Sequence, residues 1–322
     1  MSNCRIRTLT LNPAVDRTVH IEDFAVNQVN RIGWSRLDAG GKGINVSKSI
    51  HGFGGLSEAY GIVAGSAGGF IENYLSDLNI GYNFVWTDGE SRTNIKIVDP
   101  RNNTHTDIND QGPVVTEKAL AELEIQLFTG VNPDTIFVFS GSIGRGPPID
   151  IYKRWIAKAR SFGARTILDA DGEALRLGLE AVPTLVKPNI HELERLLGLN
   201  SLDKDSLPLG KIANAAKTLL ARETEWVVVS LGSGGALFLG QKITLFARGI
   251  PVQVQSTVGA GDAMVAALAL SLERRDPLSA MVTAAVGAGT AAVATEGTAV
   301  PSREALEHYR SLVTFEIIEE EL

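Results

Sequence analysis

An acidic residue follows a glycine-containing turn at Gly259, Ala260, Gly261 and Asp262, just before an apolar, alanine-rich stretch at 263–270. We predict that this stretch is a buried helix and that the glycines allow the turn that begins it. The first N–H groups of a helix lack partners within the helix and lie at the positive end of its dipole, so the turn suits an anion such as phosphate. Asp262 is then either a helix cap or a base beside that anion, and the turn alone favours neither.

A second turn contains the adjacent glycines Gly40 and Gly41, followed by Lys42 and a predicted helix at 44–53. Adjacent glycines let backbone N–H groups approach a ligand closely. Lys42 adds a positive charge, and the amide of Asn45 can bond a hydroxyl group. The alternative is a lysine in an ordinary solvent-exposed turn. The glycine spacing is not that of a P-loop, and no dinucleotide-binding glycine fingerprint follows the first predicted strand.

Arg92, Asn94 and Lys96 lie two residues apart in a predicted strand, so they share one face of it. Two cations and an amide on one face are suited to bind a phosphate group. A solvated face of an edge strand explains the same pattern equally well.

Two other predicted strands end in polar, glycine-containing loops. Ser140 closes the strand at 136–140, and Arg145 follows it. Ser230 lies near the end of the strongly apolar strand at 226–231, and Gly232 and Gly235 follow that strand. The carboxyl ends of strands in α/β sheets are where ligands bind, so the first loop can contact a substrate and the second can lie against a nucleotide. An ordinary strand-to-helix loop and a hairpin turn are the alternatives.

Lys187, Asn189 and Glu192 lie where a short predicted strand ends and a helix begins. Asn189 and Glu192 are three residues apart and can face the same way, so together they could organise Mg²⁺ through its waters. The same spacing is that of a capping box, and the two interpretations are compatible.

The segment Val286, Gly287, Ala288, Gly289 and Thr290 repeats the first turn with Thr in place of Asp. It lies within an apolar run. We therefore interpret its small residues as a site of close helix packing.

The order of elements indicates an α/β fold. Predicted strands and helices alternate along most of the chain, which implies a mostly parallel sheet covered on both faces. Two stretches, about 14–38 and 84–108, are different and resemble a small β appendage inserted into the α/β core. We expect residues 1–322 to form a single domain with this appendage.

Composition excludes several classes of function. The 322 residues are 44% hydrophobic and 21% charged with a net charge of −7, so nothing favours binding to nucleic acid or an anionic membrane. Cys4 is the only cysteine, so an intrachain disulfide and a thiolate metal site are excluded. The first seven residues lack the apolar stretch of a signal peptide, and we expect a cytoplasmic protein.

Taken together, these motifs resemble those of the PfkB (ribokinase-like) family of carbohydrate kinases. The matching residues are Asn12-Pro13-Ala14-Val15-Asp16, Gly40-Gly41-Lys42-Gly43-Ile44-Asn45-Val46, Lys187-Pro188-Asn189-x-x-Glu192 and Thr257-Val258-Gly259-Ala260-Gly261-Asp262. The resemblance implies a three-layer α/β/α fold with a mostly parallel central sheet. The β appendage becomes a lid over the sugar that two subunits of a homodimer often share. The implied activity is ATP-dependent phosphorylation of a sugar hydroxyl with Mg²⁺.

The resemblance also implies roles for individual residues. Asp262 would be the base, kept ionised by the helix start, and Gly259, Ala260 and Gly261 would form the anion hole. The implied sugar-phosphate contacts are Asp16, Gly40, Gly41, Lys42, Asn45, Arg92, Asn94, Lys96, Ser140 and Arg145, with Lys42, Arg92, Lys96 and Arg145 clamping the phosphate. The implied nucleotide contacts are Lys187, Asn189, Ser230, Gly232, Gly235, Thr257 and Gly261, and the implied Mg²⁺ site is Asn189 and Glu192.

Two stretches, 92–97 and 106–113, resemble the family members that phosphorylate fructose 1-phosphate at its 6-hydroxyl. The alternatives are kinases of tagatose 6-phosphate or fructose 6-phosphate, a ribose or nucleoside kinase, and a non-catalytic sugar-phosphate sensor. Some positions differ from the family pattern. Ala39 stands where proline is usual, and Asp110 and Gln111 stand where glycine and proline are usual.

Overall fold

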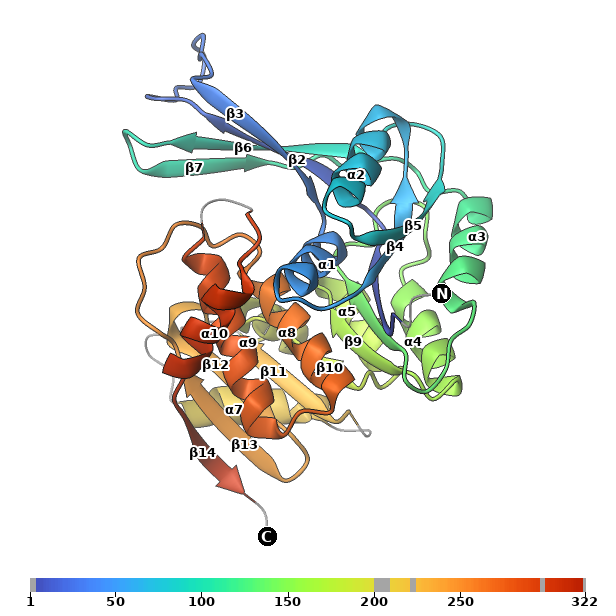
Figure 1. The fold of residues 1–322 in the computed structure, drawn as a ribbon, viewed down its shortest axis with the longest axis vertical. Helices are drawn as coiled ribbons and strands as arrows, with labels where there is room; N and C mark the ends of the chain where they lie inside the picture. Colours follow the sequence, from blue (N-terminus) through green and yellow to red (C-terminus); the bar gives the residue numbers. More distant parts are fainter. Residues whose placement is uncertain (1–3, 200–208, 221–223, 296–298, 321–322) are drawn as a thin grey trace.

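An α/β core carries a smaller β-sheet that projects from it (Figure 1). The computed structural model describes residues 4–199, 209–220, 224–295 and 299–320. The large sheet has ten strands in the order β14-β13-β12-β11-β10-β9-β8-β1-β4-β5. These strands are β1 (Ile6–Thr10), β4 (Glu58–Val63), β5 (Gly81–Trp86), β8 (Ile136–Ser140), β9 (Arg165–Asp169), β10 (Leu185–Val186), β11 (Trp226–Ser230), β12 (Gly235–Leu239), β13 (Ile243–Arg248) and β14 (Phe315–Glu320).

Neighbouring strands run parallel from β5 to β11 and antiparallel from β11 to β14. Ser140 pairs with Asp169, and Ser230 is bridged to Asn189, so the carboxyl ends of the central strands form one edge that carries polar groups. Every residue of β8 is buried, as expected for a strand with both faces covered.

Helices cover both faces of the large sheet. Apolar side chains of α3–α7 pack on one face, and those of α1, α2 and α8–α10 pack on the other. The helices are α1 (Lys42–Gly52), α2 (Gly65–Asp77), α3 (Glu117–Phe128), α4 (Ile151–Ser161), α5 (Gly172–Leu179), α6 (Ile190–Leu197), α7 (Leu209–Lys217), α8 (Ala260–Arg274), α9 (Leu278–Val293) and α10 (Arg303–Leu312), with short 3₁₀ turns at Thr218–Leu220 and Gly232–Gly234. The architecture is therefore the predicted three-layer α/β/α arrangement.

The smaller sheet corresponds to the predicted β appendage and is called the lid below. It contains β2 (Ala14–His20), β3 (Trp34–Gly40), β6 (Arg92–Asp99) and β7 (Thr104–Ile108) in the order β3-β2-β6-β7. Its boundaries differ from those expected: residues 81–86 form β5 at the edge of the large sheet, and the second lid segment begins only at Arg92. Strand β2 lies between β3 and β6, so Asp16 has a lid strand on each side.

The apolar helices α8 and α9 pack against each other, and α9 also packs against α10. Gly287 lies in α9, where an added Cβ would be 2.7 Å from the backbone nitrogen of Arg310 in α10. The repeat of the glycine turn at 286–290 is thus a close-packing segment of a helix, as its apolar setting indicated. No helix in the described parts of the chain is both long enough and apolar enough to span a membrane.

Candidate active site

Asp262 lies in the first turn of α8 and is 7% exposed. Gly259, with a φ of 80°, occupies the N-cap position and has no side chain to satisfy the first N–H groups of the helix. The carboxylate of Asp262 turns instead to α1, where its Oδ2 accepts a hydrogen bond from Asn45 Nδ2 at 2.9 Å. The α8 turn therefore combines an uncapped helix start with a buried carboxylate.

Burial raises the pKa of Asp262 to about 6, and the nearby charge of Asp169 adds to the effect. Lys42, the hydrogen bond from Asn45 and Lys187 oppose this shift. The helix start therefore does not hold this pKa at or below its ordinary value of 3.8. With a pKa near 6, the carboxylate is ionised at neutral pH and is well placed to accept a proton.

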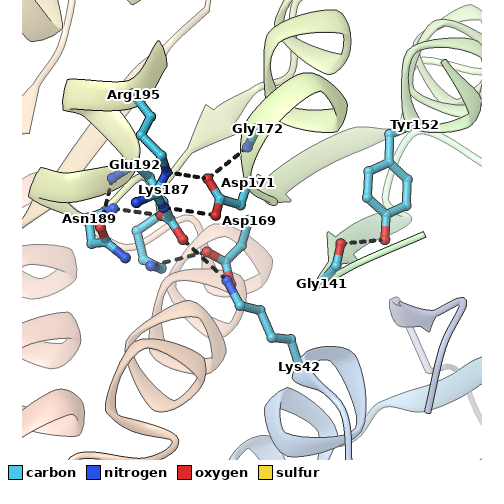
Figure 2. Close-up of polar contacts among 10 residues, drawn as sticks. All are labelled: Lys42, Gly141, Tyr152, Asp169, Asp171, Gly172, Lys187, Asn189, Glu192 and Arg195. Atoms are coloured by element: carbon cyan, nitrogen blue, oxygen red, sulfur yellow. Dashed lines mark hydrogen bonds and ion pairs between the residues drawn. The ribbon is translucent and has the colours of Figure 1, made fainter. Parts of the chain in front are cut away.

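Asp169, at the end of β9, binds the ammonium groups of two lysines (Figure 2). Its Oδ1 is 3.2 Å from Lys187 Nζ and its Oδ2 is 3.3 Å from Lys42 Nζ. Burial by itself raises the pKa of Asp169, but the two lysines outweigh burial and hold that pKa below its ordinary value. Sequence analysis did not identify Asp169 as a site residue. The available signal was an acid at the carboxyl end of a buried strand.

Lys42 has partners that the sequence did not predict. Its Nζ lies between Asp169 and Glu192, and the distance from Nζ to Glu192 Oε1 is 3.6 Å. Burial opposes the charge of Lys42, but Asp169, Glu192 and Asp262 outweigh burial and raise the pKa of the ammonium. Lys42 is therefore held at the edge of the large sheet, among the loops that also carry Lys187.

Lys187 lies beside the start of α8. A Cβ added to Gly261 would be 3.5 Å from Lys187 Nζ, so the ammonium lies against the turn that begins the helix. The uncapped N–H groups and this ammonium together form a strong site for an anion. Asp262, in the same turn, accepts the hydrogen bond from Asn45.

The lid contributes Asp16 at the middle of β2. Asn94 Nδ2, in the neighbouring strand β6, donates to Asp16 Oδ1 at 2.8 Å. A Cβ at Gly40 would overlap the Asp16 carboxylate, which explains why glycine stands there. Burial raises the pKa of Asp16, and the hydrogen bond from Asn94 opposes that effect. Lys96 pairs with the residue two positions after Asp16 in β2, which lies on the same face as Asp16.

Arg92 and Arg145 converge on the segment at 110–112. Arg92 Nε donates to Asn12 O at 3.2 Å and its Nη1 to Asp110 O at 3.5 Å, while Arg145 Nη2 donates to Gly112 O. Each guanidinium has five N–H donors, so both keep donors for an anion. The predicted phosphate clamp is thus divided: the two arginines share this segment, and Lys42 binds Asp169 at the end of β9 and Glu192 in α6.

A groove of about 940 Å³ lies beside the start of α8. It contains most of the predicted nucleotide contacts: Asn189, Ser230, Gly232, Gly235, Thr257 and Gly261. Gly235 has a φ of 105°, and a Cβ there would overlap Ala247 O, so the turn after β11 requires glycine. This turn can therefore be a hairpin turn and also lie against a nucleotide. Gly289 of α9 also lines the groove.

Asn189 and Glu192 form the alternative predicted for them, a capping box at the start of α6. Asn189 Oδ1 accepts from Glu192 N at 2.9 Å, and Glu192 Oε2 accepts from Asn189 N at 2.8 Å. Among the described residues, no group of three or more His, Cys, Asp or Glu side chains could hold a metal by itself. Glu192 Oε1 and Asp169 nevertheless present carboxylate oxygens around Lys42, which fits Mg²⁺ held through waters and phosphates rather than in a protein cage.

Comparisons with known proteins agree with this geometry. The profile described as pfkB family carbohydrate kinase matches residues 9–305. The chain is 33% identical over 293 residues to 1-phosphofructokinase of Bacillus subtilis (strain 168), which covers 90% of this chain and 93% of that protein. It is 37% identical over 272 residues to 1-phosphofructokinase of Xanthomonas campestris pv. campestris, with coverages of 82% and 83%.

The fold also matches the crystal structure of phosphofructokinase-2 from Escherichia coli in complex with substrates and products. The TM-score is 0.90 at 30% identity, and the match covers 96% of this chain and 99% of that one. The family profile and both curated relatives span most of the chain. The chain therefore belongs to the pfkB family of carbohydrate kinases and is a sugar kinase with a ribokinase-like fold.

Proposed function

We propose that this kinase transfers the γ-phosphoryl group of ATP to the 6-hydroxyl of fructose 1-phosphate, giving fructose 1,6-bisphosphate and ADP. The observation that carries the proposal is the pairing of the buried Asp262 carboxylate with the uncapped start of α8 and Lys187. A base beside an anion hole is what phosphoryl transfer to a hydroxyl requires. The two curated relatives, each named 1-phosphofructokinase, favour fructose 1-phosphate as the acceptor.

In this mechanism Asp262 accepts the proton of the sugar hydroxyl as its oxygen forms a bond to the γ-phosphorus. The bond from the γ-phosphorus to the bridging oxygen of ATP breaks, and its electron pair leaves with ADP. The N–H groups at Gly261 and the ammonium of Lys187 would stabilise the charge on the transferring group. Mg²⁺, held near Asn189 and Glu192, would neutralise charge on the ATP phosphates.

The lid side would hold the sugar phosphate. Asp16 and Asn94 present hydrogen-bonding groups for sugar hydroxyls, and Gly40 leaves the space that the Asp16 carboxylate needs. Arg92 and Arg145 would bind the phosphate already on the sugar with their remaining N–H donors. A sugar fixed at these two points presents one hydroxyl to Asp262, and this positioning is a major part of catalysis.

A panel of acceptors tests the proposal. ADP release would be measured with fructose 1-phosphate, fructose 6-phosphate, tagatose 6-phosphate and ribose in one coupled assay. We expect fructose 1-phosphate to give the highest kcat/KM. A preference for fructose 6-phosphate or tagatose 6-phosphate would identify that sugar phosphate as the acceptor instead. A preference for ribose would contradict the binding of a sugar phosphate by Arg92 and Arg145. Binding of a sugar phosphate without ADP release would identify a sensor.

We also propose a homodimer that forms through the lid, in a cytoplasmic enzyme. On the lid face opposite Asp16, the strand register places Leu37, Arg17, Ile95 and Ile108 in one row across the sheet. Leu37 is 46% exposed and Ile108 is 52% exposed, so the row is a largely apolar surface with one cation, which a second lid could cover. ATP as a substrate and a single cysteine both fit the cytoplasm.

A further inference from the structure

Lys48 is a buried lysine that the proposed mechanism does not use. It lies in α1 and is only 2% exposed. Its Nζ donates to Ala39 O at 2.8 Å, contacts Asn45 Oδ1 at 3.4 Å and lies 5.5 Å from the centre of the Tyr74 ring. A buried ammonium is costly unless it is paired, so these contacts fix its place.

The contact with Asn45 determines how that amide is oriented. Asn45 presents its Oδ1 to Lys48 and its Nδ2 to Asp262 Oδ2. If the amide turned over, its N–H groups would face the ammonium and its oxygen would face the carboxylate. Both contacts would be repulsive, so Lys48 keeps the donor end of Asn45 on Asp262.

The contact with Ala39 ties the same ammonium to the lid. Ala39 is in β3, directly before Gly40, the residue against which the Asp16 carboxylate lies. One charged group therefore holds both the lid strand that borders the sugar site and the amide that binds the base.

Other charged groups also surround Lys48 and Asp262. Lys48 faces Asp16 of β2, Arg36 and Asp38 of β3 and Asp262 of α8, together with the Tyr74 ring of α2. Burial lowers the pKa of Lys48, and the three acids oppose that effect. Asp262 itself faces Lys42 and Lys48 of α1, Asp169 at the end of β9 and Lys187 after β10. Loss of the Lys48 charge would therefore disfavour the ionised form of Asp262.

We propose that Lys48 is a positioning residue that orients Asn45, and through it the base Asp262, and that connects this pair to lid strand β3. The proposal rests on the proposed function in taking Asp262 as the base. Lys48 itself touches neither substrate.

The test uses Lys48→Met and Lys48→Arg in the full-length enzyme, with kcat, both KM values and the pH profile of kcat/KM. We expect Lys48→Met to lower kcat by about 10- to 100-fold, since displaced catalytic groups cost this much. The acid limb of the profile should move to higher pH, because the ionised form of Asp262 loses a nearby cation. Lys48→Arg should keep the wild-type limb. The KM for ATP should change little, because Lys48 does not line the nucleotide groove.

A double-mutant cycle separates positioning from a general loss of structure. If Lys48 acts through Asn45, adding Lys48→Met to Asn45→Ala should lower the limiting kcat much less than it does in the wild type. Lys158→Met is the matched control, because Lys158 of α4 also lies over a ring, that of Phe128, and pairs with Glu124 of α3. It should leave the acid limb unchanged.

Several results would overturn the proposal. A folded Lys48→Met enzyme with wild-type kcat and acid limb contradicts it, and so do fully additive effects with Asn45→Ala. If the Met variant does not fold, Lys48→Gln keeps an N–H donor without the charge, and the same shift and non-additivity are required of it. Asp262→Asn distinguishes the two proposals: if that variant stays active, the base assignment fails, whereas an inactive Asp262→Asn with a normal Lys48→Met enzyme overturns only the role of Lys48.

Discussion

At the scale of single residues, the site is a set of buried charges that oppose one another. Asp169 separates Lys42 from Lys187 and, at the same time, makes Asp262 harder to ionise. The same arrangement therefore brings two ammonium groups close to a carboxylate with a raised pKa. Sequence analysis identified Asp262, Lys42 and Lys187 from their motifs. It missed Asp169 because the partners that give this acid its role come from α1 and from the segment after β10.

Replacing Asp262 by Asn tests the base directly. Because a positioned general base contributes about 10²–10⁴-fold, we expect kcat to fall by at least 10²-fold with little change in the KM for ATP. In the wild type, kcat/KM should fall below about pH 6, where Asp262 becomes protonated. Steady-state kinetics across pH measure both effects. A loss of less than 10²-fold would argue against the base assignment.

The same substitution should stabilise the protein. The folded-state pKa of Asp262, about 6, is above its ordinary value of 3.8, so the folded chain binds this proton more tightly than the unfolded chain. The stability that this group contributes is present below about pH 4 and is lost as the pH rises through 6. Asp262→Asn should therefore raise the free energy of unfolding at pH 7 by up to about 3 kcal/mol.

Urea unfolding at pH 7 and near pH 4 measures this difference. The gain should disappear at the lower pH, because Asp262 is then protonated in both states of the wild type. Equal gains in the free energy of unfolding at the two pH values would show that burial of the ionised Asp262 carboxylate does not destabilise the protein.

At the scale of elements, the alternation of strands and helices was sufficient to predict the layered core and the existence of a lid. This alternation was insufficient to place the lid boundary, because β5 and β6 both have sequences typical of strands. Only the pairing of β5 with β4 assigns β5 to the core. The local sequence pattern also could not predict that Arg92 and Arg145 have different partners from Lys42. Which carbonyls receive Arg92 and Arg145 depends on how the segment at 110–112 folds back against Asn12.

The contact between α9 and α10 gives a prediction at this scale. Gly287→Ala places a Cβ 2.7 Å from the Arg310 backbone nitrogen, so the helices must separate slightly. We expect a loss of about 1–3 kcal/mol in the free energy of unfolding, which is typical of overpacking. Gly289→Ala is the matched control in the same helix, because its nearest neighbours would be 3.6 Å away, an ordinary contact.

Thermal or urea unfolding of the two variants measures the difference. The Gly289 variant should be as stable as the wild type or slightly more stable, since alanine favours a helix more than glycine does. If both variants have the same stability, close approach of α10 is not the reason for glycine at 287.

At the scale of the whole molecule, the proposed mechanism uses two separate sheets. The proposed base, anion site and nucleotide groove belong to the large sheet and α8, whereas Asp16 and Arg92 belong to the lid. The lid has few apolar contacts of its own, with Val19, Ile21 and Ile97 as its small buried cluster. A sheet with so small a core gains stability if its second face is covered, and this is the physical reason to expect a partner subunit there.

Leu37→Asp tests that expectation. The substitution places a charge at the β3 end of the row, beside Arg17, where a lid-to-lid dimer would remove it from water, so we expect the variant to dimerise more weakly than the wild type. Its KM for the sugar phosphate should rise while its KM for ATP stays close to that of the wild type, because only the lid loses support. Leu56→Asp is the control: Leu56 is 64% exposed and belongs neither to the lid nor to the site. Light scattering of the wild type and both variants measures the oligomeric state. A wild-type monomer, or a Leu37 variant that dimerises as well as the Leu56 variant, would contradict a dimer formed through the lid.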